Sequence, residues 1–432
     1  MNLAALVVAS SLSCSGGELT PVERAAGWRS YSGPDATMLW RSYNGPAFPS
    51  KGWRVDDGVL TIGKGGGGGD LMTAAAFGDF EMSFRFKLGN ASNSGIMWRV
   101  KETSQPPYMT GPEFQLLEDG TFPPGFKPGQ SCGAMYDLFD PAPAAGESKR
   151  LNPAGEWNEG RIYLRNGVVQ HWINGVKIVD GHIFDDAGEP TQEWAARIGK
   201  SKFAGAAGFG VQKSGHIAIQ DHGDTELSLA DIKIRDLTNA REREVELFNG
   251  KDFAGWTTCL PGAKDPMQAW SIADGVMICK GQPIGYIRTK EKYTNFILRL
   301  QWRFDPAKGA GNSGVLVRMV GEDKVWPKSV EAQLHSGNAG DFWNIDEFKM
   351  TVDPARTNGR NTRKLATASP VERPLGEWNE YEIIVNRGDV VLFVNGQELN
   401  RATDVEEIPG FICLQSEGAE IHFRNIRLVP LD

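Results

Sequence analysis

The sequence predicts an all-β protein made of two tandem β-sandwiches. Three observations support this prediction: apolar and polar residues alternate in many short segments, glycine accounts for 52 of the 432 residues, and the second half of the chain repeats motifs of the first. No segment has the apolar periodicity of an amphipathic helix of about 12 residues or more. A chain of this length can form two or three domains, each with its own core.

Composition excludes several classes of protein. A hydrophobic share of 40% and a charged share of 23% are those of an ordinary globular protein, not of a disordered chain, a collagen or a small disulfide scaffold. The net charge of −8 argues against binding to nucleic acid or to an anionic membrane surface. No apolar run approaches the roughly 20 residues that span a bilayer. The 13 tryptophans are typical of many sugar-binding proteins.

Residues 1–20 are predicted to be a signal peptide or a lipoprotein signal with its tether. Leu3–Leu12 is an apolar run of the length of a signal-peptide core, although no Lys or Arg precedes it. Cys14 loosely matches a lipid-attachment site, with Ser11 where a Leu is expected. We therefore expect export to the periplasm, the cell envelope or the medium. A lipid anchor at Cys14 is one way in which the exported protein could be held at the envelope. The alternative is a frayed apolar terminus.

The other cysteines do not form a zinc motif. They show no CxxC spacing and no histidine at zinc-finger distance. In an exported protein Cys259 and Cys279 could pair, and buried free thiols are an equal alternative. These cysteines are Cys132, Cys259, Cys279 and Cys413.

An internal repeat at a spacing of about 220 residues indicates two whole domains. Six motifs recur in the same order, which chance does not explain. The pairs are Trp53–Leu60 with Trp270–Met277, Asn93–Arg99 with Asn312–Arg318, Glu113–Leu116 with Glu331–Leu334, Gly155–Glu159 with Gly376–Glu380, Asn174–Gly175 with Asn395–Gly396, and Ile219–Gln220 with Leu414–Gln415. The charged run Arg241–Glu246 marks the boundary, and the predicted domains are 35–240 and 244–432.

Period-two alternation within each copy predicts antiparallel sheets. Phe80–Leu88, Arg161–Arg165 and Phe296–Phe304 alternate in this way, so each buries one face. Val168–Ile173 and Val390–Val394 each lead into Asn-Gly, the preferred two-residue hairpin turn. Each copy is therefore expected to be a two-sheet sandwich.

The ordered motifs of both copies resemble the 3-keto-disaccharide hydrolase family. Leu247–Phe253, Asn312–Gly314, Gly376–Glu380 and Phe423–Arg427 follow one another in the second copy, and the first copy has Gly133–Leu138, Glu156–Asn158, His171–Gly175 and Gly215–Gly223. The resemblance covers residues 35–237 and 244–431. It implies a concanavalin A-like lectin/glucanase jelly roll in each copy. The two copies differ at Gln220–Gly223, where the second has Gln415–Gly418.

The resemblance also implies cleavage of glycosides whose sugar is oxidised at C3. A ketone at C3 acidifies the C2 proton, so a base can form an enolate that expels the C1 substituent, and water then adds back. Such a site needs a base with a raised pKa, a cationic group or metal at the enolate oxygen, and an acid for the leaving group. The Glu-x-Asp-x-x-Glu motif of jelly-roll glucanases is absent, so paired-carboxylate glycosidase chemistry is not supported.

In the first copy the candidate catalytic base is Glu113 or His222. Glu113 and Gln115 share one face of a strand at period two. The candidates for contacts to sugar hydroxyls are Gln115, Tyr136, Asp137, His171 and Asp221. The structural alternatives are a rim ion pair for Glu113, a turn for Asp221–Gly223 and a core-edge histidine for His171.

In the second copy Glu331 and His335 form a candidate acid/base or metal pair, because residues i and i+4 of a strand point the same way. Gln333, Trp343 and Glu417 are its candidate substrate contacts. Two ligands do not identify a metal, so binding of a divalent cation is left as one alternative for this pair. No other cofactor is expected. Asn93–Gly95 and Asn312–Gly314 are predicted to be turns or bulges.

Three functions remain open at this point. The first is an exported enzyme that acts on 3-keto-glycosides, favoured by the histidines and carboxylates among the matched motifs. The second is a non-catalytic carbohydrate-binding protein, since the same fold serves lectins and tandem copies add avidity. In the third, one copy is catalytic and the other binds sugar.

Overall fold

The computed structural model describes residues 18–143, 148–185, 187–223, 225–238, 244–265, 267–367 and 370–431. Cys14 and nearly all of the predicted leader lie outside these ranges. The chain divides into two compact units. The first contains Gly27–Thr238, and the second contains Asn239–Asp432 together with Pro21–Ala26, which includes the short helix α1 (Pro21–Ala25). Among the described residues no helix is long and apolar enough to cross a membrane.

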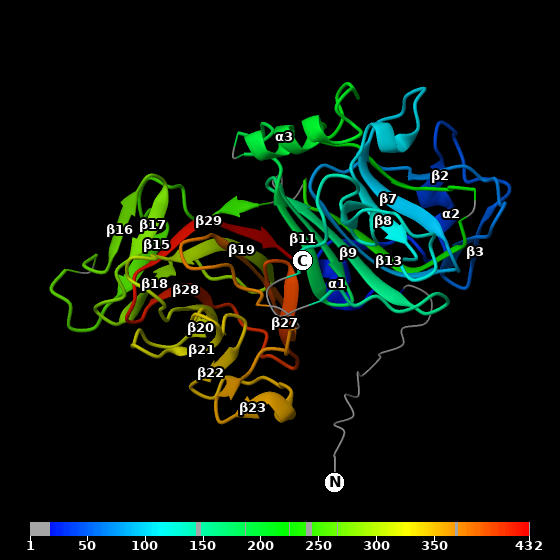
Figure 1. The fold of residues 1–432 in the computed structure, drawn as a ribbon. Coiled ribbons are helices and arrows are strands. Elements are labelled where there is room, and N and C mark those ends of the chain that lie inside the picture. The colour runs from blue at the N-terminus through cyan, green and yellow to red at the C-terminus, as the bar shows by residue number, and fades with distance from the viewer. Residues whose placement is uncertain are drawn as a thin grey trace, which may run out of the picture. The chain divides into compact units, whose positions relative to one another are not determined.

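The first unit is a jelly-roll sandwich of two antiparallel sheets (Figure 1). One sheet has the order β11-β10-β9-β6-β13-β4-β3 with β1 paired to β13, and the other has the order β2-β5-β12-β7-β8. Its elements are β1 (Trp28–Ser30), α2 (Ala36–Leu39), β2 (Trp40–Ser42), β3 (Trp53–Asp56), β4 (Val59–Ile62), β5 (Leu71–Thr73), β6 (Phe80–Leu88), β7 (Asn93–Val100), η1 (Pro107–Met109), β8 (Glu113–Leu117), η2 (Pro128–Gln130), β9 (Asn158–Arg165), β10 (Val168–Ile173), β11 (Val176–His182), α3 (Gln192–Lys200), β12 (His216–Ile219) and β13 (Leu227–Asp236).

The second unit is built in the same way (Figure 1). One sheet has the order β16-β17-β29-β19-β25-β26-β27 with β14 paired to β29, and the other has the order β15-β18-β28-β20-β21-β22-β24-β23. Its elements are β14 (Val245–Glu246), β15 (Trp256–Cys259), β16 (Trp270–Ala273), β17 (Val276–Cys279), β18 (Gly285–Thr289), β19 (Phe296–Phe304), β20 (Gly314–Val320), β21 (Lys328–Gln333), β22 (Phe342–Ile345), η3 (Pro354–Arg356), β23 (Thr357–Asn358), β24 (Asn361–Thr362), β25 (Asn379–Asn386), β26 (Asp389–Val394), β27 (Gln397–Ala402), β28 (Phe411–Ser416) and β29 (Ile421–Pro430).

The core of each unit lies between its two sheets, as the alternating pattern predicts. In β6, Phe84, Phe86 and Leu88 are buried, while Arg85 and Lys87 between them are half-exposed. Phe84 meets Phe114 of the opposite sheet with ring centroids 5.6 Å apart. Full burial of such a side chain contributes roughly 1.5–3 kcal/mol. The prediction of an all-β fold with two sandwiches is confirmed.

Turn chemistry agrees with the sequence at the hairpins but not at the Asn-Ser-Gly motifs. Asn174 and Gly175 both have positive φ (47° and 78°), as a type I′ turn requires. Asn93–Gly95, predicted as a turn or bulge, is instead the start of β7. Its glycine serves the site described below. All four described cysteines are free thiols, so Cys259 and Cys279 are not paired.

Candidate functional site

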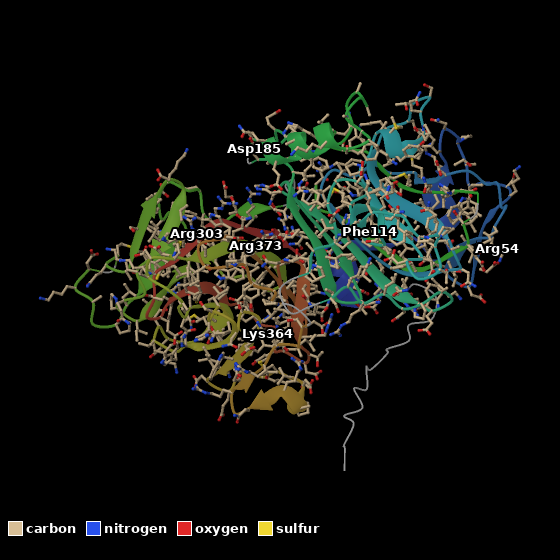
Figure 2. All side chains as sticks on the ribbon, in the orientation of Figure 1. Arg54, Phe114, Asp185, Arg303, Lys364 and Arg373 are labelled. Atoms are coloured by element: carbon tan, nitrogen blue, oxygen red, sulfur yellow. The ribbon has the colours of Figure 1, made fainter. Side chains whose placement is uncertain are left out.

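In the first unit the candidate site lies on the outer face of the sheet that contains β7 and β8. Phe114 of β8 belongs to the core, and Figure 2 shows it among the packed side chains of this unit. Because neighbouring residues of a strand point to opposite faces, Glu113 and Gln115 point away from that core. Register places Met97 of β7 directly opposite Glu113. The outer face therefore joins two polar side chains to an apolar floor.

Gly95 creates the space that the Glu113 carboxyl group occupies. A Cβ added to Gly95 would lie 1.8 Å from Glu113 Oε1, so no larger residue fits beneath this carboxyl group. Glu113 is 4% exposed. The glycine of the Asn-Ser-Gly motif is thus required by close packing against a functional side chain, and its φ lies outside the left-handed region.

Burial raises the pKa of Glu113 to about 8. The positive charge of Lys202 opposes this shift and the negative charge of Asp70 adds to it. A carboxyl group with such a pKa can exchange a proton near neutral pH, which is the property that a general base or acid requires.

Lys202 is the cation of this site and was not predicted from the sequence. Its Nζ lies 4.0 Å from the ring centroid of Tyr136 and 5.1 Å from those of Tyr108 and Phe203. Desolvation of the ammonium group among these rings lowers the pKa of Lys202, while the charges of Glu113 and Asp137 oppose that shift. No motif surrounds this lysine, which lies in the loop after α3.

Asp137 and Tyr136 support Lys202. Asp137 has a φ of 58° and accepts a hydrogen bond from the backbone N–H of Lys202 at 2.7 Å. The hydroxyl of Tyr136 accepts a hydrogen bond from Gln130 Nε2 at 3.1 Å. These contacts make Asp137 a residue that positions the Lys202 loop, and Tyr136 the aromatic wall beside its ammonium group.

Asp70 was not predicted from the sequence either. Its charge acts on Glu113, and its side chain is hydrogen-bonded to the Asp221–His222 segment. Asp70 accepts a hydrogen bond from the backbone N–H of Asp221 at 2.8 Å, and Asp221 accepts one from that of Gly69 at 3.0 Å. Burial raises the pKa of Asp70 to about 6. His222 is exposed, and its backbone N–H donates to Thr225 Oγ1 at 2.9 Å. The glycine run that ends at Asp70 is the signal that could have drawn attention to this residue.

Gln115 presents a free acceptor to the same face. Its Nε2 donates to Asn93 Oδ1 at 3.1 Å, whereas its buried Oε1 has no partner. An unpartnered buried acceptor costs about 1–3 kcal/mol, and a ligand hydroxyl would offset that cost. This geometry fits the predicted role of Gln115 as a contact to a sugar hydroxyl.

His171 does not belong to the site, which corrects the expectation drawn from its strand. It is 0% exposed and packs on Phe114 with ring centroids 4.7 Å apart, on the core side of β8. Its Nδ1 lies 3.0 Å from the carbonyl oxygen of Gly133. Burial lowers the pKa of His171 to about 4, so the ring is neutral. The strand alternation was ambiguous because both faces of β10 are largely buried.

In the second unit Glu331 occupies the position equivalent to that of Glu113. A Cβ on Gly314 would lie 2.3 Å from Gln415 Oε1 and 2.5 Å from Glu331 Oε1, so these two oxygens are neighbours above the glycine. Trp343 of β22 is directly opposite Glu331 and half-exposed. The structure thus brings Glu331, Trp343 and Gln415 to one outer face.

The second unit carries Glu417 at the position where the first has His222. Burial raises the pKa of Glu331 to about 8, and the charge of Glu417 adds to the shift. Burial also raises the pKa of Glu417 to about 7. Arg360 acts on Glu331 in the opposite sense, but its side chain is exposed.

The predicted pairing of Glu331 with His335 on one strand is wrong. β21 ends at Gln333, and His335 lies exposed in the following turn. Gln333 Oε1 accepts hydrogen bonds from the backbone N–H groups of Leu334 and His335 at 2.8 and 3.0 Å, so its side chain holds that turn. The i, i+4 rule failed because the strand stops between the two residues.

Both units are similar in sequence to known proteins. A sequence profile described as "3-keto-alpha-glucoside-1,2-lyase-like domain" matches residues 27–237 and 243–429. A 3-keto-disaccharide hydrolase of Bacteroides thetaiotaomicron is 30% identical over 228 residues, which are 46% of this chain and 70% of the relative.

Two solved structures are also similar. A "putative glycosyl hydrolase" from Parabacteroides distasonis has 29% identity and a TM-score of 0.45, covering 51% of this chain and 99% of its own. A β-glucanase of Bacillus licheniformis has 12% identity and a TM-score of 0.31, covering 43% and 97%. With both copies matched by one profile, the chain belongs to the 3-keto-alpha-glucoside-1,2-lyase-like family.

Proposed function

We propose that the protein cleaves the glycosidic bond of sugars oxidised at C3, and that the chemistry takes place in the first unit. The observation that carries this proposal is the burial of the Glu113 carboxyl group over Gly95, near enough to Lys202 for the charge of the ammonium group to act on it. Membership of the family supports the substrate class.

Glu113 is the proposed base. Its carboxylate accepts the C2 proton of the 3-keto sugar while the C2–H electron pair moves to form the enolate, with the negative charge on the C3 oxygen. The raised pKa makes the ionised carboxylate a stronger base than an exposed glutamate. Burial over Gly95 fixes its position, so little reorientation is needed when the proton moves.

Lys202 is the proposed stabiliser of the enolate oxygen. Its charge is partly desolvated among aromatic rings, where an ion interacts more strongly than in water. The enolate oxygen then re-forms the C3 carbonyl group, the C2=C3 electron pair becomes the C1=C2 double bond, and the C1–O bond breaks. The leaving oxygen keeps that bond's electron pair and takes a proton from water. Water adds at C1 of the resulting enone and a proton returns to C2, which completes a net hydrolysis.

Gln115 and the Asp70–Asp221 pair are proposed to orient the sugar. The free Gln115 Oε1 accepts from a hydroxyl group, and Met72 and Met97 form the apolar floor. His222, the alternative base, is exposed. Its place next to Asp221 suits a contact at the rim of the site.

Replacement of Glu113 by Gln tests the proposal. We expect E113Q to lower kcat on a 3-keto-disaccharide by about 10²- to 10⁴-fold, the usual contribution of a positioned base. The matched change E331Q removes an equally buried carboxyl group from the second unit and discriminates between the copies. Loss of turnover in E331Q with retention in E113Q would assign the chemistry to the second unit. Sugar binding without any turnover would favour a lectin.

We further infer that the protein is exported. The apolar run Leu3–Leu12 supports this inference, and Cys14 is the proposed lipid-attachment residue. Fractionation of the producing cells should recover the processed protein outside the cytosol, and C14S should release it from the membrane fraction. Recovery of an unprocessed chain in the cytosol would contradict export.

A further inference from the structure

Tyr136 lies directly beside the buried Glu113 on the outer face of the first unit. Residues 133–136 run along the edge of β8, and Phe114 forms a bridge with Met135. The backbone N–H of Tyr136 donates to the carbonyl oxygen of Glu113 at 3.0 Å. Residues that are directly opposite each other in an antiparallel pair point to the same face. Phe114 and Met135 both belong to the core, so Tyr136 and Glu113 share the outer face.

A hydrogen bond from Gln130 orients the hydroxyl group of Tyr136. The Gln130 side chain is itself held in place, because its Oε1 accepts a hydrogen bond from the backbone N–H of Lys127 at 2.9 Å. Its Nε2 therefore faces Tyr136 and donates to the phenol oxygen at 3.1 Å. Among the described residues the phenol O–H donates to no acceptor, so its proton is available to a ligand on this face.

The chemical state of Tyr136 suits a proton donor. Burial raises the pKa of Tyr136, and the charges of Glu113 and Asp137 add to the shift, so the phenol holds its proton in the neutral range. A phenol is still a stronger acid than an aliphatic alcohol, so it can protonate a sugar alkoxide as that alkoxide leaves. Asp137 and Asp70 each accept a backbone N–H, so these carboxyl groups act as acceptors instead.

The second unit lacks a hydroxyl group at the equivalent position. The register of β21 and β22 places Trp343 directly opposite Glu331, as Tyr136 is opposite Glu113 in the first unit. An indole N–H can donate a hydrogen bond, but it does not give up its proton in the neutral range. Both units therefore keep an aromatic ring beside the buried glutamate, and only the first unit adds a transferable proton.

The proposed cleavage needs a proton on the oxygen that leaves C1, and water is the final source of that proton. We propose that the hydroxyl group of Tyr136 relays it, an inference that rests on the proposed function. As the C1–O bond breaks, the leaving oxygen keeps the electron pair of that bond and takes the phenolic proton. The resulting phenolate takes a proton from the water molecule whose oxygen forms the new bond to C1. The ammonium group of Lys202, 4.0 Å from the ring centroid, stabilises the phenolate between these two steps.

The variant Y136F, measured on two substrates that share the same 3-keto sugar, tests this role. One substrate carries a second sugar as its leaving group, and the other carries 4-nitrophenol, which departs as a stable anion without an acid. We expect Y136F to lower kcat on the 3-keto-disaccharide by about 10²- to 10⁴-fold, and on the nitrophenyl substrate by less than about tenfold. Y293F removes the hydroxyl group of a half-buried tyrosine in the second unit and should leave both rates unchanged.

A second variant, Q130L, keeps the test decisive if Y136F folds poorly. Gln130 is a positioning residue, so its loss should slow the disaccharide about two- to tenfold, the worth of one hydrogen bond, and leave the nitrophenyl substrate unaffected. E113Q should slow both substrates alike, because the C2 proton must be removed whatever the leaving group is. Equal losses on both substrates in Y136F, or full activity of Y136F on the disaccharide, would overturn the role of Tyr136 alone. Failure of the wild type to turn over either substrate would contradict the proposed function itself.

Discussion

The two units place a buried glutamate at the same point of the same fold but surround it with opposite charges. Glu113 lies over Gly95, where the positive charge of Lys202 acts on it, whereas Glu331 lies over Gly314, where the negative charge of Glu417 acts on it. In both, burial raises the pKa to about 8.

The difference teaches that the fold fixes the carboxyl group while the loops decide its chemistry. A carboxylate next to a cation suits deprotonation and enolate stabilisation. A buried acid next to a second acid is less suited to stabilise a developing negative charge. Duplication has thus kept the sheet and the glycine and has changed the partner of the acid.

Removal of the Lys202 ammonium group should have the largest effect on turnover, because only the first unit has this lysine beside its buried glutamate. K202M is expected to lower kcat by about 10²- to 10³-fold, the usual effect of removing one group that stabilises an oxyanion. Because Lys202 lowers the pKa of Glu113, its loss should also move the rise of rate with pH to higher pH. A pH profile of kcat measures both effects, and K202R, which keeps the charge, should retain part of the rate. An unchanged profile in K202M would remove Lys202 from the mechanism.

Replacement of the matched glycines Gly95 and Gly314 by alanine should affect turnover differently in the two units. In G95A the new Cβ would meet Glu113 Oε1 at 1.8 Å, so the carboxyl group must move. A displacement of about 1 Å at a reacting group costs roughly 10²-fold in rate. G314A should leave turnover intact, because the proposed chemistry takes place in the first unit. Equal effects of the two variants on turnover would contradict the division of roles.

Stability should depend on pH through both buried glutamates. The pKa of each is raised in the folded state, so the folded state holds more protons than the unfolded state between about pH 4.5 and pH 8. Stability is therefore greatest at the acidic end and falls as pH rises, by up to about 1.4 kcal/mol per pH unit for each carboxyl group. E113Q and E331Q should each remove one contribution in denaturant titrations across this range. Parallel pH curves for wild type and E113Q would show that the pKa of Glu113 is not raised.

The smallest effect on turnover is expected for H171F. Replacement of the buried ring leaves the buried Gly133 carbonyl oxygen without the histidine contact and should cost about 1–3 kcal/mol of stability. Its kcat/KM, corrected for the folded fraction, should match that of the wild type. A loss of activity without a loss of stability would return His171 to the site.

Sequence periodicity was sufficient to predict the two β-sandwiches and the buried glutamate of each unit, Glu113 and Glu331. Alternation identified the sheets, and it placed Glu113 and Gln115 on one face because it depends only on local geometry. It could not find Lys202 or Asp70, since their approach to Glu113 depends on how distant loops return to the sheet. It also misplaced His171 and His335: one strand is buried on both faces, and the other ends before the histidine.

Deuterium incorporation tests the central claim most directly. If Glu113 removes the C2 proton, turnover of a 3-keto-disaccharide in D2O must leave one deuterium at C2 of the released 3-keto sugar. We expect this label with the wild type and with E331Q, a rate of formation greatly reduced in E113Q, and no comparable label when the 3-keto monosaccharide product is incubated alone. Turnover by the wild type with hydrogen fully retained at C2 would contradict deprotonation by Glu113.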